Sequence, residues 1–199
     1  MDESRRQPPV PKTVVVCGGG IIGVCTAYFL AKKGIAVTLI ERSSIACAAS
    51  GKAGGFLALH MWDDGPLSSL ACVSFNLHRS LAEELDGSRS YDYRPLTALT
   101  VSVDESEPPL RCPILPPWVN GRVKTEEIIG TTETKAQIQP QLFTRGLLAK
   151  AVSEYVVEVV TEIMESMAAE EEGMVVKVDG GGVIGGDWGC SGFGSWAVD

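Results

Sequence analysis

Three glycines and one carboxylate near the start of the chain have the types and spacing needed to hold a diphosphate and a sugar. Gly18, Gly20 and Gly23 follow the pattern G-x-G-x-x-G, and Glu41 follows roughly 20 residues later. Glycine allows a tight turn and lets backbone N–H groups approach a diphosphate closely. A carboxylate at this distance accepts hydrogen bonds from both ribose hydroxyls and repels a 2′-phosphate. The pattern therefore predicts a site for FAD or NAD rather than NADP.

A strand, a helix and a second strand are needed to position these residues. The apolar run Val14–Cys17 predicts a parallel strand that is buried on both faces. A helix over 21–33 follows, and the N–H groups of its first turn, that of Ile22 included, face the phosphates together with the positive end of the helix dipole. Residues 36–40 supply the second strand, which ends at Glu41. We therefore predict a Rossmann-like α/β domain.

Composition and charge exclude several other classes of protein. The chain is 45% hydrophobic and 21% charged, which is typical of a globular domain. A net charge of −8 argues against nucleic acid or anionic lipid as partner. The apolar stretch around the glycines is too short and too rich in glycine to span a membrane. With 2 histidines and no C-x-x-C pair, no metal site is predicted, and the six cysteines indicate a reducing, cytoplasmic location.

A second run of small residues comes after the second strand. It contains Ser50, Gly51, Lys52, Gly54 and Gly55, and it is followed directly by Phe56 and Leu57. Small residues let the backbone approach a flat ligand, and successive N–H groups bind carbonyl and phosphate oxygens. The alternative is a solvated loop without a ligand. Such a loop would not need two apolar residues at its end.

The sequence GGGIIG, the Glu-Arg pair after the second strand and SGKAGGFLA together resemble FAD-dependent oxidoreductases of the D-amino-acid oxidase, glycine oxidase and sarcosine oxidase type. The form SGKAGGFLA is most similar to a eukaryotic branch known simply as FAD-dependent oxidoreductases. The resemblance implies an FAD-binding domain with an inserted antiparallel-sheet substrate domain. It also implies oxidation of the C–N bond of an amino acid or an amine-like small molecule.

The same resemblance implies roles for individual residues. Gly18, Gly20 and Gly23 would hold the diphosphate, Glu41 the ribose, and Arg42 would lie beside the adenosine. The second run of small residues, with Phe56 and Leu57, would pass the phosphates and the flavin ring. In the resembled family the arginine and tyrosine that orient the substrate lie mostly in a second half that we expect this chain to lack. His60, Trp62 and Asp63, just past the flavin loop, are substrate-facing candidates to which we assign no catalytic role.

Periodicity predicts the remaining elements. A helix over 67–85 is expected to face the core with Leu70, Val73, Leu77, Leu81 and Leu85, and to leave His78 at the surface. We further predict a strand over 97–103, a proline-rich loop over 107–118 that Trp118 pins, and a helix over 143–158 with Val152 inward. Strands over 156–160 and 174–178, separated by an acidic loop at 170–172, and a hairpin turn at 180–182 complete the list.

These elements predict a domain division and an unusual end. We expect a flexible N-terminus over 1–11, an FAD-binding domain over 12–90 and 136–187, and part of a substrate domain over 91–135. Residues 188–199 depart from the hydrophobic strand that follows GGD in the family, so we expect an aberrant or alternative tail, from a frameshift or splicing, and loss of a central strand. Two alternatives stay open: a non-catalytic truncated isoform, or an NAD-dependent dehydrogenase, against which the second glycine run argues.

Overall fold

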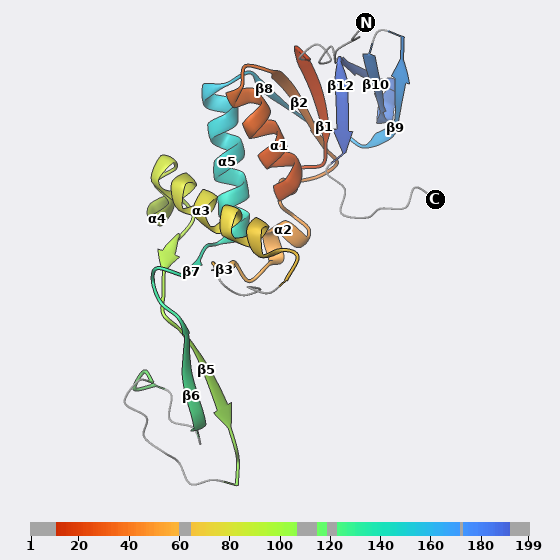
Figure 1. The fold of residues 1–199 in the computed structure, drawn as a ribbon. Helices are drawn as coiled ribbons and strands as arrows, with labels where there is room; N and C mark the ends of the chain where they lie inside the picture. Colours follow the sequence, from red (N-terminus) through yellow and green to blue (C-terminus); the bar gives the residue numbers. More distant parts are fainter. Residues whose placement is uncertain (1–10, 60–64, 107–114, 119–122, 172, 192–199) are drawn as a thin grey trace, which may run out of the picture. The chain divides into compact units, whose positions relative to one another are not determined.

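The computed structural model describes residues 11–59, 65–106, 115–118, 123–171 and 173–191, which belong to two compact units (Figure 1). Unit 1 comprises Met1–Gly54 and Gln139–Asp199, and unit 2 comprises Gly55–Ile138. Residues 55–90, which the sequence analysis assigned to the FAD-binding domain, therefore belong to unit 2. Compactness does not define function, so the functional division into 12–90, 91–135 and 136–187 stays a prediction.

A four-stranded parallel sheet forms the centre of unit 1. Its strand order is β12-β1-β2-β8, with β1 at Thr13–Cys17, β2 at Ala36–Glu41, β8 at Val157–Thr161 and β12 at Trp188–Ser191. Residues 14–17 of β1 are all buried, because β1 lies between two other strands and is covered on both faces. The apolar run at the start of the chain thus predicted this strand correctly.

Helices and a second sheet cover the two faces of the parallel sheet. Helices α1 (Ile21–Lys32) and α5 (Pro140–Glu154) lie side by side on one face, as Figure 1 shows. An antiparallel sheet of β9 (Met164–Glu170), β10 (Gly173–Val178) and β11 (Val183–Gly186) covers the other. Its Val176 and Val178 pack with Val15 and Ile40 in one core cluster. The predicted fold class, a Rossmann-like domain with additional antiparallel sheets, is confirmed.

Three expectations for unit 1 are wrong in detail. The helix over 143–158 begins at Pro140 and ends at Glu154, and Val152, expected inward, is 48% exposed. Strand β9 was missed because most of its side chains are exposed and lack an apolar alternation. The expected loss of a strand near residue 188 did not occur, since β12 pairs in parallel with β1. Residues 192–199 lie outside the described part, and the origin of the tail stays a prediction.

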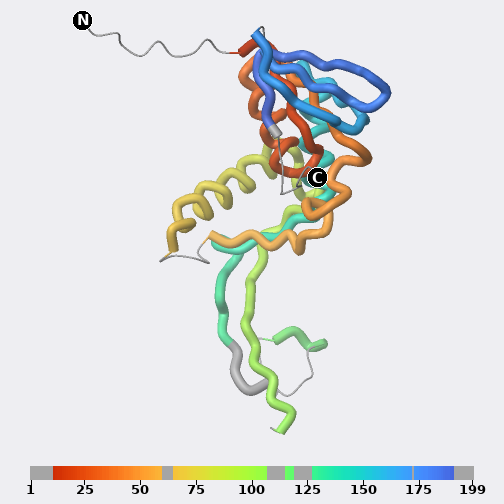
Figure 2. Tube along the Cα trace, turned by 90° about the vertical axis from the view of Figure 1, so that its right-hand side faces the viewer, coloured from red at the N-terminus to blue at the C-terminus, as the bar shows by residue number. Residues whose placement is uncertain are grey.

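Unit 2 contains a small antiparallel sheet and one long helix. The sheet has the order β3-β7-β4, with β3 at Phe56–Ala58, β4 at Arg94–Pro95 and β7 at Lys135–Gln137. A paired ribbon of β5 (Ala98–Val103) and β6 (Val123–Gly130) extends away from this sheet (Figure 2). Helix α3 spans Ser68–Glu84, and the short helix α4 spans Gly87–Ser90.

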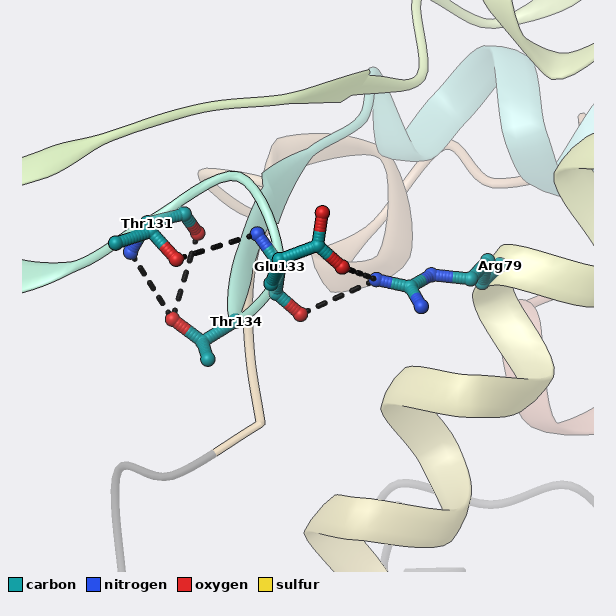
Figure 3. A network of polar contacts seen from close by, with 4 residues as sticks. All are labelled: Arg79, Thr131, Glu133 and Thr134. Carbon is teal, nitrogen blue, oxygen red and sulfur yellow. Dashed lines mark hydrogen bonds and ion pairs between the residues drawn. The ribbon is translucent and has the colours of Figure 1, made fainter.

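A polar network ties α3 to the turn before β7 (Figure 3). Arg79 Nη2 donates a hydrogen bond of 3.1 Å to the Glu133 carbonyl oxygen and lies 3.6 Å from Glu133 Oε2. Thr131 N donates to Thr134 Oγ1 at 3.0 Å within the same turn. These contacts hold one face of the helix against the turn.

The predicted core face of α3 is confirmed for Leu81 and wrong for three of its other residues. Leu70 and Val73 are each 64% exposed and Leu77 is 41% exposed, whereas Phe75 and Leu81 are buried. His78, expected at the surface, is half-buried, and desolvation lowers its pKa.

Several other expectations concern residues that lie outside the described ranges or next to their ends. Trp118 is 80% exposed, so it does not pin the proline-rich loop, most of which lies outside the described residues. His60, Trp62 and Asp63 also lie outside them. Within the described residues, no helix combines the length and apolarity needed to cross a bilayer.

Candidate functional site

The turn between β1 and α1 requires glycine at two of its positions. Gly18 has φ +108°, a conformation that side chains disfavour, and its N–H donates to the Ile40 carbonyl oxygen at 2.7 Å. A Cβ on Gly23 would lie 1.9 Å from the Gly18 carbonyl oxygen. The glycine at position 23 therefore lets α1 pack directly against the turn, as the sequence pattern predicts.

The first turn of α1 presents backbone donors. The Ile21 N–H donates to Ser50 Oγ at 2.9 Å, and the first helical backbone bond is from Val24 N to the Gly20 carbonyl oxygen at 2.9 Å. Within the part of the chain that the structure describes, the N–H groups of Gly20, Ile22 and Gly23 have no acceptor. Unpaired donors at the positive end of a helix form a ready anion site.

Glu41 is fixed beside this turn. Its Oε2 accepts from the Gly19 N–H at 2.7 Å, and its Oε1 accepts from Ser43 N at 3.1 Å and Ser43 Oγ at 3.3 Å. A Cβ on Gly19 would lie 2.6 Å from Ile45 Cδ1 and 3.0 Å from Glu41 Cγ, so this extra glycine makes room for the carboxylate. A carboxylate has about four acceptor sites, which leaves Oε2 able to accept from a ribose hydroxyl.

The second run of small residues reaches the same turn. Helix α2 (Ala49–Lys52) carries Ser50, whose Oγ would lie 3.1 Å from a Cβ on Gly20. Ser50 uses its oxygen to accept from Ile21, so its single O–H proton stays available for an anion. The structure thus brings Ser50 to the glycines with which the sequence analysis grouped it.

The other predicted residues are less constrained. Arg42, Lys52 and Gly54 are exposed in unit 1. Gly55, Phe56 and Leu57 belong to unit 2, where Phe56 and Leu57 pair with Gln137 and Ala136 of β7. Contact of these six residues with a cofactor stays a prediction.

Four residues around the site were not singled out from the sequence. Gly19 and Ser43 hold Glu41, while Gln141 and Arg145 on α5 donate to carbonyl groups in the loop 42–48. Gly19 lies within the glycine motif and Ser43 lies two residues after Glu41. The predicted role of the Glu41 carboxylate could therefore have indicated both as its hydrogen-bond donors. Gln141 and Arg145 lie 95 and 100 residues from the residues that they bind, and no pattern near them indicates those carbonyl groups.

Three thiols near the site differ in the direction in which their pKa is shifted. Burial raises the pKa of Cys17, on β1, and of Cys25, on α1, to about 11 each, and the nearby Cys190 adds to the effect at Cys17. Cys47 is exposed in the loop 42–48, and its hydrogen bond with Ser43 lowers its pKa. The thiols of Cys17 and Cys25 therefore stay protonated at neutral pH and act as small apolar groups.

A glycine turn with free helical donors, an adjacent carboxylate and a parallel sheet define a dinucleotide-binding α/β protein. The chain belongs to the family described as FAD dependent oxidoreductase, whose model matches residues 13–188.

Individual relatives agree with this family. A Schizosaccharomyces pombe protein named as an oxidoreductase, with no substrate specified, is 35% identical over 148 residues, covering 70% of this chain and 38% of the relative. Glycine oxidase from Geobacillus kaustophilus has a similar fold, with a TM-score of 0.71, 21% identity, and coverage of 94% of this chain and 56% of the other. Iminodiacetate oxidase from Chelativorans sp. BNC1 gives a TM-score of 0.70 at 19% identity, over 89% and 54% of the two chains.

These coverages show that the chain spans between about a third and somewhat more than half of the length of these relatives. The part that it spans contains the glycine turn, Glu41 and Ser50. The available N–H groups and the anchored carboxylate fit the diphosphate and ribose of FAD.

Proposed function

We propose that this chain binds FAD at the turn Gly18–Gly23 and belongs to an oxidoreductase that oxidises the C–N bond of an amino acid or an amine-like small molecule. The observation that carries the cofactor assignment is the set of unpaired N–H groups on Gly20, Ile22 and Gly23 beside the anchored carboxylate of Glu41. The names of the structural neighbours, glycine oxidase and iminodiacetate oxidase, support the substrate class.

The residues of this chain hold and orient the cofactor. The N–H groups of the first turn of α1 and the O–H of Ser50 donate to the diphosphate, and Glu41 accepts from the ribose. Exposed Arg42 and Lys52 provide positive charge near the anionic cofactor. Contact of Gly54, Gly55, Phe56 and Leu57 with the cofactor is a prediction from the sequence. Bound FAD supplies the hydride acceptor that the side chains lack.

Turnover requires groups that hold the substrate over the flavin. The chain spans little more than half of the glycine oxidase with the similar fold, so this requirement concerns the whole protein. The described residues that we assign to the site all hold the cofactor, so cofactor binding without turnover is a second candidate function. One set of measurements separates the two.

The decisive experiment is an absorption spectrum of freshly purified protein, with identification of the cofactor released by heat. We expect the visible bands of oxidised flavin and released FAD. Anaerobic addition of glycine, sarcosine or iminodiacetate would bleach these bands if the chain turns substrate over, and would leave them unchanged if it only binds. A colourless protein that takes up no added FAD, or that prefers NADH, would refute the cofactor assignment.

The variant Glu41→Gln tests the ribose contact. Loss of a charged hydrogen-bond acceptor is expected to weaken FAD binding roughly tenfold to a hundredfold. Competition by ADP should weaken while competition by ADP with a 2′-phosphate should not, because the repelling charge is gone. Glu165→Gln, which changes an exposed carboxylate on β9, is the matched control and should leave both affinities unchanged. Equal affinities in wild type and Glu41→Gln would remove Glu41 from the site.

A further inference from the structure

The loop over 42–48 contains one residue in an unfavourable backbone conformation. Ala46 has φ +55°, in the left-handed region, and it is only 2% exposed. A residue with a Cβ adopts this conformation where surrounding contacts impose it. The contacts around Ala46 therefore decide where the loop lies.

Three hydrogen bonds hold this residue and the one before it. The Ala46 N–H donates to the Gly19 carbonyl oxygen at 3.0 Å. Gln141 Nε2 donates to the Ala46 carbonyl oxygen at 3.1 Å, and Arg145 Nε donates to the Ile45 carbonyl oxygen at 3.2 Å. Gln141 and Arg145 are four residues apart and so share one face of α5. We call them the α5 pair.

The Ala46 carbonyl group also positions helix α2. A Cβ on Gly51 would lie 1.9 Å from the Ala46 carbonyl oxygen and 3.0 Å from Gln141 Nε2, so Gly51 packs directly on this hydrogen bond. Ser50 is the adjacent residue, and it accepts from Ile21 N at the start of α1. The position of the Ser50 hydroxyl thus depends on the Ala46 carbonyl, which Gln141 holds.

We infer that Gln141 and Arg145 are positioning residues for the diphosphate site. Gln141 holds the Ala46 carbonyl, and Arg145 holds the Ile45 carbonyl beside it. The Ala46 carbonyl in turn places Gly51, and hence the Ser50 hydroxyl, at the first turn of α1. This inference rests on the proposed FAD-binding function and extends it to a helix far away in sequence.

A double-variant experiment tests this path. Gln141→Met keeps a similar length but removes the donor, and it should weaken FAD binding roughly threefold to tenfold. In a Ser50→Ala background the same change should weaken FAD binding by less than about twofold, because the hydroxyl through which Gln141 acts is gone. Glu154→Gln removes an exposed partner of Lys150 on the same helix and should leave FAD affinity unchanged. Arg145→Met serves as a second variant should Gln141→Met fold poorly.

Hydrogen exchange of the Ala46 amide gives a readout that needs no cofactor. Without the hydrogen bond from Gln141 to the Ala46 carbonyl, this amide should exchange faster in Gln141→Met than in wild type or Glu154→Gln. Unchanged exchange would overturn the inference whatever FAD does. Equal weakening of FAD binding in both Ser50 backgrounds, or none at all, would also overturn it. If the Ala46 amide exchanges faster in Gln141→Met but the wild type binds no FAD, the proposed function is refuted, and with it the cofactor role of the α5 pair.

Discussion

Helices α1 and α3 are both rich in apolar side chains, yet they bury them very differently. Helix α1 packs against both the parallel sheet and its neighbour α5, and it buries Val24, Ala27, Tyr28 and Ala31. Helix α3, in unit 2, contacts a sheet whose strands are two or three residues long, and it buries only Phe75 and Leu81. Apolar periodicity predicts a helix and a face. Burial of that face also requires a partner surface of comparable length.

The largest expected effect on stability and FAD binding comes from a substitution in α1, the more buried of the two helices. Gly23→Ala would place a methyl group against the Gly18 carbonyl oxygen, so the turn must move. We expect a loss of roughly 3 kcal/mol in the free energy of unfolding and no measurable FAD binding. Gly146→Ala, in α5, is the control, since a Cβ there meets nothing within 4 Å. It should raise the unfolding free energy by roughly 0.5–1 kcal/mol, as measured by urea denaturation. A Gly23→Ala protein as stable as wild type would show that α1 packs less tightly than described.

The two faces of α3 provide the next test. Leu81→Ala should cost roughly 2–5 kcal/mol of unfolding free energy, because Leu81 is 4% exposed. Leu70→Ala, at 64% exposure, should change it by less than about 0.5 kcal/mol. Equal large losses in the two variants would mean that the Leu70 face is covered in the protein in solution, and the contrast with α1 would disappear.

A smaller effect concerns alkaline pH. Burial raises the pKa of Cys17 and Cys25 from 9.0 to about 11, so the folded state retains protons that the unfolded state loses. Their contribution to stability is complete below about pH 9 and is lost as pH rises towards 11. Urea midpoints of wild type should therefore fall between these values, and those of Cys17→Ala should fall less. Parallel declines in both proteins would contradict burial of the Cys17 thiol.

The sequence predicted β1, α1 and β2 well because their determinants are local. The apolar run, the glycines and Glu41 all lie within one continuous segment, and each needs only its neighbours to be placed. The role of the α5 pair could not be read in this way, since nothing near Gln141 or Arg145 indicates the carbonyl groups that they bind. The prediction that Leu70 and Val73 of α3 face the core was wrong for a related reason. Their spacing predicts a helix, but whether another element covers them depends on the three-dimensional structure. Strand β9 gave no pattern, because exposed residues are not constrained to alternate.

The hydroxyl of Ser50 has one further consequence. Its oxygen already accepts from the Ile21 N–H, so the hydroxyl group is held at the first turn of α1 before any ligand arrives. An anion that binds there meets a donor group already in place, so the entropy of ordering the Ser50 side chain has been lost during folding rather than at association. Threonine would preserve this arrangement, whereas alanine would leave the helix end to be solvated by water that each ligand must first displace.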